Sequence, residues 1–155
     1  MENKGQRKEL QVSAIENGTV IDHIPALSLF QVLHLLHLEG FRNQILFGTN
    51  LDSQKYGKKA IIKVSDKFFR AEEINRIALF APTATLIEIR NYQVVLKKKV
   101  EIPDELVNMV KCFNPLCITN HEQMVTRFRV VDKAELKVQC RYCEKIMERD
   151  DMVFL

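Results

Sequence analysis

The chain has 155 residues, enough for one domain or two small ones. Hydrophobic residues make up 46% of it and charged residues 28%, an ordinary globular balance with enough apolar material for a core, and the low counts of Gly (5) and Pro (4) argue against long disordered stretches. The longest apolar stretch, 26–38, contains four polar residues and is too short to cross a bilayer. The first eight residues are polar and charged, with no apolar segment behind them that could act as a signal peptide, so we expect a cytoplasmic protein.

The net charge of +3 is unevenly distributed along the chain. Residues 1–103 contain 15 Lys and Arg against 11 Asp and Glu, whereas residues 104–155 contain 8 against 9. The first part is therefore the better candidate for binding an anionic ligand.

The first hundred residues alternate between strand and helix patterns. Two β-prone runs, 10–16 and 19–21, flank Asn17-Gly18 and predict a hairpin or tight turn there. A helix is expected from Pro25 to about residue 38, apolar on most sides and closed by Gly40. The remaining elements are expected in this order: strands at 44–51 and 58–64, a helix at 71–80, and strands at 85–90 and 92–96.

The order β, α, β, β, α, β with one additional strand predicts an α+β fold, a ferredoxin-like antiparallel sheet with two helices on one face. Residues 97–103, which begin with three lysines, are expected to form a linker. We therefore expect one domain at 1–103 and a second at 104–155. The second should hold a short helical turn at 104–109 and strands at 125–131 and 136–139, a small all-β, zinc-ribbon-like domain.

The four cysteines form two close pairs. Cys112 and Cys117 are separated by four residues, Cys140 and Cys143 by two, and 22 residues lie between the pairs. This spacing is typical of a tetrahedral four-thiolate zinc site, and in the cytoplasm such cysteines are more often metal ligands than disulfides. The alternative is four free core cysteines at these spacings by chance. With every position filled by sulfur, the one ion per chain would be structural, and residues 104–155 should be largely unfolded without it.

No catalytic motif is visible. The chain contains no nucleophile elbow, phosphate loop or dinucleotide fingerprint, and no evident carboxylate pair, which argues against an enzyme. His34 and His37 are more typical of the wet side of a helix than of metal ligands. Asp22 and His23 are adjacent and should point to opposite faces of a strand.

Lys59 and Lys63 should share one face of the strand at 58–64, about 13 Å apart. That distance suits one lysine near a triphosphate and the other near a ribose, although two lysines on a strand are more often simply exposed to solvent.

Several short motifs occur in order along nearly the whole chain. They are Gly18-Thr19-Val20-Ile21-Asp22-His23-Ile24-Pro25, Lys59-x3-Lys63, Ala81-Pro82-x-Ala84-Thr85, Asn91-Tyr92-x-Val94-Val95, and Cys112-x-Asn114-x2-Cys117-Ile118 with Cys140-x-Tyr142-Cys143-Glu144. In this combination the chain resembles the regulatory chain of aspartate carbamoyltransferase. The resemblance implies a non-catalytic subunit of pyrimidine synthesis with an N-terminal allosteric domain and a C-terminal zinc domain that contacts the catalytic chain. It also implies regulatory homodimers that join two catalytic trimers into a dodecamer with three such dimers.

The resemblance further implies a binding site for nucleoside triphosphates. The residues that would contact the nucleotide are Val12, Ser13, Ala14, Ile15, Asp22, His23, Lys59, Lys63, Tyr92, Val94 and Lys97. Ile87 and Ser13 depart from the polar residues that family members often carry at these positions, so the preferred base and the direction of its effect stay open.

Two alternatives of other classes remain. A zinc-ribbon nucleic-acid-binding protein would fit the cysteines, but the cysteine half is slightly acidic whereas phosphate binding needs clustered Lys and Arg. A small-molecule enzyme on the N-terminal domain lacks a candidate nucleophile or base. The loop 113–116 between the first two cysteines carries Phe113, Asn114 and Leu116, which would suit a protein interface if exposed or cap a small core if buried.

Overall fold

The computed structural model describes residues 14–155. The chain divides into two compact units, Met1–Glu101 and Ile102–Leu155, and each is described by itself. Of the first arm of the predicted hairpin, 10–16, residues 10–13 lie outside the described residues, and residues 14–16 are described but form no strand.

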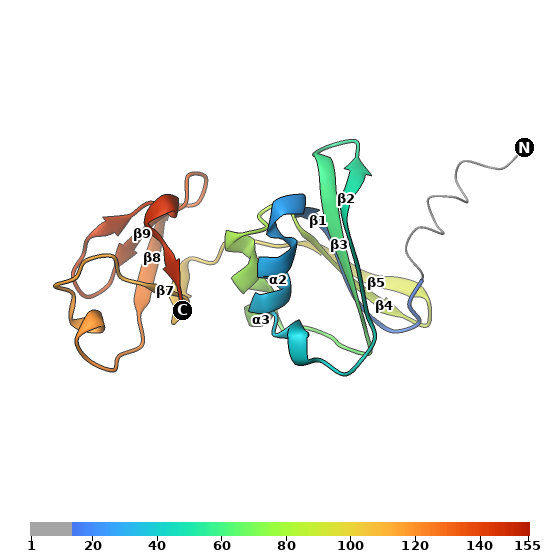
Figure 1. Cartoon of the computed structure of the whole chain (residues 1–155), viewed down its shortest axis with the longest axis horizontal. Helices are drawn as coiled ribbons and strands as arrows, with labels where there is room; N and C mark the ends of the chain where they lie inside the picture. Colours follow the sequence, from blue (N-terminus) through green and yellow to red (C-terminus); the bar gives the residue numbers. More distant parts are fainter. Residues whose placement is uncertain (1–13) are drawn as a thin grey trace, which may run out of the picture. The chain divides into compact units, whose positions relative to one another are not determined.

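The N-terminal unit is built on one antiparallel sheet of five strands in the order β2-β3-β1-β4-β5. The strands are β1 (Gly18–Pro25), β2 (Ile45–Ser53), β3 (Gly57–Ser65), β4 (Thr85–Arg90) and β5 (Gln93–Lys99). Helices α2 (Leu29–Leu35) and α3 (Ala71–Asn75) lie on the same face of this sheet (Figure 1). Strand order and helix placement confirm the predicted ferredoxin-like α+β arrangement, with β5 as the additional strand.

The first helix is shorter than predicted. Residues 26–38 form a 3-10 turn, η1 (Ala26–Ser28), then α2, and the chain turns again in η2 (Leu38–Gly40). The α-helix stops because His37 adopts a left-handed conformation, with φ of 55°. Gly40 therefore ends the second 3-10 turn and not the helix itself.

The second helical segment spans nearly the predicted range. Helix α3 continues directly into a 3-10 turn, η3 (Arg76–Leu79). Its first turn is fixed by Glu73, whose Oε2 accepts the Arg70 backbone N–H at 2.8 Å.

The run Lys97 to Lys99 is not a linker, as the sequence suggested, but the end of β5. Lys97 pairs with Ile87 and Lys99 with Thr85 on β4. The β-branched residues before it favour a strand, and lysines at a sheet edge discourage pairing with other chains.

Gly18 begins β1 where no other residue fits. Its φ is +144°, and a Cβ there would collide with the Val64 carbonyl oxygen of β3. Next to it, the Asn17 carbonyl accepts the Asp66 backbone N–H at 2.9 Å.

The C-terminal unit is all-β, as predicted, and very small. A four-stranded sheet has the order β10-β9-β8-β6, and a separate pair joins β7 and β11. The elements are β6 (Glu105–Val107), β7 (Val110–Lys111), η4 (Ile118–Asn120), β8 (Arg127–Asp132), β9 (Lys137–Cys140), β10 (Ile146–Met147), η5 (Arg149–Asp151) and β11 (Val153–Phe154).

The helical turn predicted at 104–109 is instead strand β6, which pairs with β8. Leu106, fully buried, lies opposite the equally buried Phe128, and this contact outweighs the weak local preference for a turn. Val138 and Met147 complete a thin core on the same side of the sheet.

Candidate functional site

One face of the N-terminal sheet carries two of the predicted lysines in a single cross-strand row. Lys63 on β3 lies opposite Val20 on β1, Val20 opposite Ile87 on β4, and Ile87 opposite Lys97 on β5. Directly opposed residues share a face, so Lys63 and Lys97 project from the same side, about 14 Å apart at the usual strand spacing. Between them lie two apolar side chains.

This face also has its own apolar cluster. Ile15, Val20 and Ile61 are buried on it, and Leu51, Ile87 and Ile89 pack against them. Val20 and its chain neighbour Ile21, which is fully buried, point to opposite faces. We call the side that carries Val20, Lys63 and Lys97 the outer face, because α2 and α3 cover the other one.

A bulge in β1 shapes one end of the outer face. The register with β3 shifts between Ile21 and Ile24, and His23 has a φ of 57°. The bulge lets the His23 ring reach the Thr85 hydroxyl at 3.3 Å, and Thr85 is the cross-strand neighbour of Asp22. The expectation that Asp22 and His23 diverge strictly to opposite faces therefore fails, because a bulge breaks the alternation of a strand.

Asp22 is the acidic centre of this region. Its Oδ1 accepts the His23 backbone N–H at 2.6 Å and lies 2.8 Å from Lys59 Nζ. Burial lowers the pKa of Lys63, and the negative charge of Asp22 partly opposes that shift. Lys59 and Lys63 thus both stand in the field of one carboxylate.

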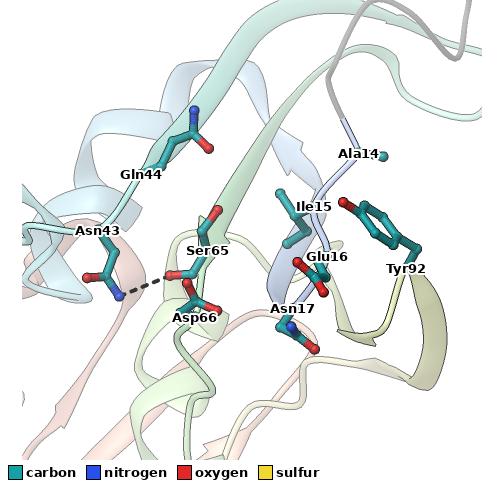
Figure 2. Close-up of a pocket in the computed structure, with 9 residues that line it drawn as sticks. All are labelled: Ala14, Ile15, Glu16, Asn17, Asn43, Gln44, Ser65, Asp66 and Tyr92. Atoms are coloured by element: carbon teal, nitrogen blue, oxygen red, sulfur yellow. Dashed lines mark hydrogen bonds between the residues drawn. The ribbon is translucent and has the colours of Figure 1, made fainter.

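A pocket of about 390 Å³ lies at the end of the sheet where β1 begins (Figure 2). Of the predicted nucleotide residues, Ala14, Ile15 and Tyr92 line it. The segment 14–17 is held against the turn between β4 and β5, because the Tyr92 backbone N–H donates to the Glu16 carbonyl at 2.9 Å. Its polar lining comes from Glu16, Asn17, Asn43, Gln44, Ser65 and Asp66.

The predicted residues that the structure describes thus fall into two neighbouring groups. Asp22, His23, Lys59, Lys63 and Lys97 belong to the outer face, whereas Ala14, Ile15 and Tyr92 line the pocket. Val94 lies opposite Ile89, which packs against the outer-face cluster, so it stands at the margin of the same face and is 61% exposed. Val12 and Ser13 lie outside the described residues.

Sequence reasoning missed Thr85 and Ile61 as parts of this face. Both stand on strands whose alternation was recognised, so the register alone could have placed them beside Asp22 and Val20.

The four cysteines of the C-terminal unit converge. Their sulfur atoms all lie within 4.8 Å of one another, with 3.6 Å between Cys112 and Cys143 and 3.8 Å between Cys117 and Cys140. A disulfide requires about 2.05 Å, so these are not bonded pairs. A tetrahedral ion with metal–sulfur bonds of about 2.3 Å sets its sulfurs about 3.8 Å apart, and the observed spacing fits such an ion.

Backbone N–H groups point at the sulfurs from the turns that carry them. Burial raises the pKa of Cys112, against the effect of the Asn114 N–H, and burial likewise raises the pKa of Cys140. Cys143 differs: burial would raise its pKa, but hydrogen bonds from the Lys145 N–H and the Asn114 side chain bring it down to about 7. Such donors stabilise thiolates, as a metal site requires.

The backbone of the loop between Cys112 and Cys117 is held by hydrogen bonds, while two of its apolar side chains are exposed to solvent. The Asn120 amide donates to the Cys112 carbonyl at 2.9 Å and to the Asn114 carbonyl at 2.7 Å. Leu116 is 84% exposed and Phe113 45%, so the loop presents apolar side chains to solvent and does not cap the core.

Comparison with known protein families shows the family to which the chain is related. Residues 10–101 match the family described as aspartate carbamoyltransferase regulatory chain, allosteric domain, and residues 104–153 match the metal binding domain of the same chain. The chain belongs to the aspartate carbamoyltransferase regulatory chain family.

Individual relatives agree over almost their whole length. The regulatory chain of Parabacteroides distasonis is 53% identical over 148 residues, covering 96% of both chains. That of Bacteroides fragilis is 54% identical over 149 residues, covering 96% of this chain and 97% of the relative. The regulatory chain of Pyrococcus horikoshii is 50% identical over 147 residues, covering 94% of this chain and 97% of the relative.

Membership of this family makes the chain a regulatory and non-catalytic subunit of a pyrimidine-synthesis enzyme, with an allosteric and a metal-binding domain. Among the described residues, no helix is both long and apolar enough to span a membrane.

Proposed function

We propose that residues 1–103 bind nucleoside triphosphates as allosteric effectors and that residues 104–155 hold one structural zinc ion and dock on the catalytic chain. The observation that carries the first half is the outer-face row, in which Lys63 and Lys97 flank Val20 and Ile87. The lysines would take phosphate oxygens, and the apolar residues would support the sugar and base.

The pocket beside Ala14, Ile15 and Tyr92 would receive the base end of the nucleotide. Its lining is rich in hydrogen-bonding side chains (Figure 2), and the pocket lies at the end of the same sheet where β1 begins. Asp22 and His23 would lie by the sugar and phosphates, together with Lys59. The nucleotide would regulate by binding one state of the whole enzyme more tightly than another, since equal affinity for both states shifts nothing.

Zinc is the ion that the four sulfurs suit. A four-thiolate tetrahedron is the usual structural zinc site, and it leaves no position open for water or substrate. The sulfur spacing supports this assignment, as does the thin core of the C-terminal unit, which has little else to stabilise it.

Homodimers would form through the N-terminal unit. Leu27 is 97% exposed, Phe30 69% and Phe47 52%, and the two phenylalanine rings lie 6.4 Å apart. Leu27 lies in η1, Phe30 on α2 and Phe47 on the edge strand β2, where a second copy could cover the apolar side chains and pair with the strand. Three such dimers would link two catalytic trimers.

Analytical ultracentrifugation of this chain mixed with catalytic trimers from its own host tests the proposal. Zinc-loaded chain should assemble with the trimers, chelation should release them intact and active, and nucleoside triphosphates should change the aspartate saturation curve only of the assembly. Failure of the zinc-loaded chain to assemble would overturn the docking role, and an unchanged saturation curve would overturn the effector role.

A further inference from the structure

The outer surface of the C-terminal sheet concentrates positive charge. Its buried side carries Leu106, Phe128 and Val138, so the alternate residues point outward. Three of these are arginines: Arg127 and Arg129 on β8 and Arg141 just beyond β9. We call them, with Glu105, Val107 and Ile146 on the same side, the arginine face.

The register fixes how these side chains stand. Glu105 lies opposite Arg129, and Val107 lies opposite Arg127. Phe128 pairs with Cys140, so Arg127 and Arg141 also oppose each other, and the Arg141 N–H donates to the Arg127 carbonyl at 2.9 Å. Ile146 lies opposite Gln139, which in turn lies opposite Arg129.

Within the described residues, a single carboxylate, that of Glu105, contacts two of the three guanidinium groups on this face. Glu105 Oε1 lies 3.6 Å from Arg141 Nε and 4.0 Å from Arg127 Nη1, and it is shared between them. Arg129 donates to the neutral Gln139 amide oxygen at 2.8 Å. Within the part of the chain that the structure describes, no carboxylate pairs with Arg129.

This arrangement is unfavourable for the sheet by itself. Like charges directly opposite each other on neighbouring strands destabilise the pair, and Arg127 faces Arg141. The six residues of the arginine face carry three positive charges and one negative, and beside them on β9 Lys137 is paired with Glu135 and Glu148, whereas residues 104–155 as a whole carry 8 Lys and Arg against 9 Asp and Glu. An external anion would relieve the repulsion.

We infer that the arginine face is a docking surface for an acidic, extended segment of a partner protein. In an extended chain, alternate side chains stand about 7 Å apart, which is also the spacing of Arg127 and Arg129 along β8. Two glutamates or aspartates at alternate positions could each meet one guanidinium, a geometry that arginine binds in a bidentate manner.

The flanking residues favour a protein over a nucleic acid. Val107 is 39% exposed and Ile146 52%, and they border the arginines on the two outer strands, β6 and β10. Apolar side chains beside charged ones suit a peptide with alternating side chains, whereas a phosphate backbone is bound by broader basic surfaces. This inference does not depend on the nucleotide site or on the docking loop 113–116.

The test is a titration of the zinc-loaded full chain with a capped peptide of alternating glutamate and threonine, followed by NMR of the arginine Nε–H groups. The Arg127, Arg129 and Arg141 signals should shift on binding, and the corresponding glutamine–threonine peptide should leave them in place. Arg127→Gln with Arg129→Gln should weaken binding about tenfold or more, as should Arg141→Gln separately.

The matched control removes two charges elsewhere in the same unit, Lys111→Gln with Lys133→Gln, and should bind as the wild type does. Because the three arginines are exposed, all variants should keep zinc and an unchanged backbone spectrum. The inference is overturned if the two peptides bind equally, if the control loses as much affinity as the arginine variants, or if an oligothymidylate binds this face more tightly than the glutamate peptide.

Discussion

Asp22 and Lys59 form an ion pair across two strands of the N-terminal sheet, with Lys59 Nζ 2.8 Å from Asp22 Oδ1. Both side chains are mostly covered, 21% exposed for the lysine and 17% for the aspartate. The same carboxylate acts on Lys63. In the chain without a ligand, Asp22 therefore occupies the position of the anion for lysines that we assign to phosphate binding.

Replacing Asp22 should show whether its carboxylate competes with phosphate for the two lysines. Asp22→Asn removes the charge but keeps the shape, so inorganic triphosphate, which has no sugar, should bind several-fold more tightly than to the wild type. Lys59→Ala should weaken triphosphate binding about tenfold or more relative to the wild type, since a hydrogen bond to a charged group contributes about 1.5–3 kcal/mol. Titration calorimetry measures both. Lys55→Ala, an exposed lysine in the β2–β3 turn, serves as the control, and equal affinities throughout would remove Asp22 and Lys59 from the site.

Nucleotide affinity should depend on pH through Lys63. Burial lowers the pKa of this lysine below its usual 10.5, and a bound triphosphate would favour the charged form. Affinity should therefore fall as pH rises through the lowered pKa, with a proton taken up on binding. Without nucleotide the sign is opposite: between the lowered pKa and 10.5 the unfolded chain binds more protons, so stability rises with pH.

The matched variant is Lys63→Arg, which stays charged over this whole range. Its affinity should stay flat where that of the wild type declines. Calorimetry in two buffers of different ionisation enthalpy measures the proton uptake, and a decline that is identical in both proteins would contradict the role of Lys63.

Zinc binding should release protons. Burial raises the pKa of Cys112 and Cys140, so both thiols are protonated at neutral pH in the metal-free chain and must lose their protons to bind metal. The lowered pKa of Cys143 belongs to the folded turns, so in the unfolded metal-free unit it does not protect this thiol from protonation before the ion binds. Zinc affinity should therefore fall steadily on acidification. A chelator competition series around neutral pH measures the slope, and a zinc affinity that does not change with pH would contradict ligation by thiolates.

Loss of one thiol should unfold one unit and spare the other. Cys140→Ser removes a ligand and a charge that balances the ion, so the chain should lose its zinc, and residues 102–155 should become sensitive to protease. The N-terminal unit should keep its affinity for nucleotide. Metal analysis and limited proteolysis test this, and a zinc-free variant with a protected C-terminal unit would show that the metal does not hold the fold.

The exposed loop allows docking to be separated from metal binding. Leu116→Ala should leave zinc content unchanged and weaken assembly with catalytic trimers, because the side chain is 84% exposed and contributes little to the core. Asn114→Ala should affect both, since the Asn114 side chain also bonds to Cys143. Sedimentation with parallel metal analysis distinguishes them. A Leu116→Ala chain that assembles normally would place the docking surface elsewhere.

Asn120 should raise the affinity for the metal indirectly, by orienting the loop that carries the ligands. Its amide holds the carbonyls of Cys112 and Asn114, and Asn120→Asp would place a carboxylate against those two oxygens. Groups that orient metal ligands typically contribute about 10–100-fold in affinity. Chelator competition should show a loss of this size, and an unchanged zinc affinity would make Asn120 dispensable for the loop.

The sequence predicted the sheet and the cysteine arrangement because both follow from short repeats: alternation along β3 and β4, and paired ligand spacing around the turns. The prediction was wrong where contacts between segments far apart in the sequence determine the local structure. β6 forms because Leu106 packs on Phe128, and β5 extends through Lys99 because β4 offers partners. The bulge at His23 and the left-handed His37 leave no simple signal, since neither residue is a glycine. The lysine row needed the register of four strands, which no single segment encodes.

The two cysteine pairs close a loop in the chain when they share an ion. Closing it restricts the unfolded ensemble, so metal availability in the cell would determine how many newly made chains acquire a folded C-terminal unit. A chain synthesised under zinc shortage would still fold its N-terminal sheet and take up nucleotide, yet it could not couple that nucleotide to catalysis. Zinc supply would in this way set the fraction of the cell's carbamoyltransferase that responds to its effectors.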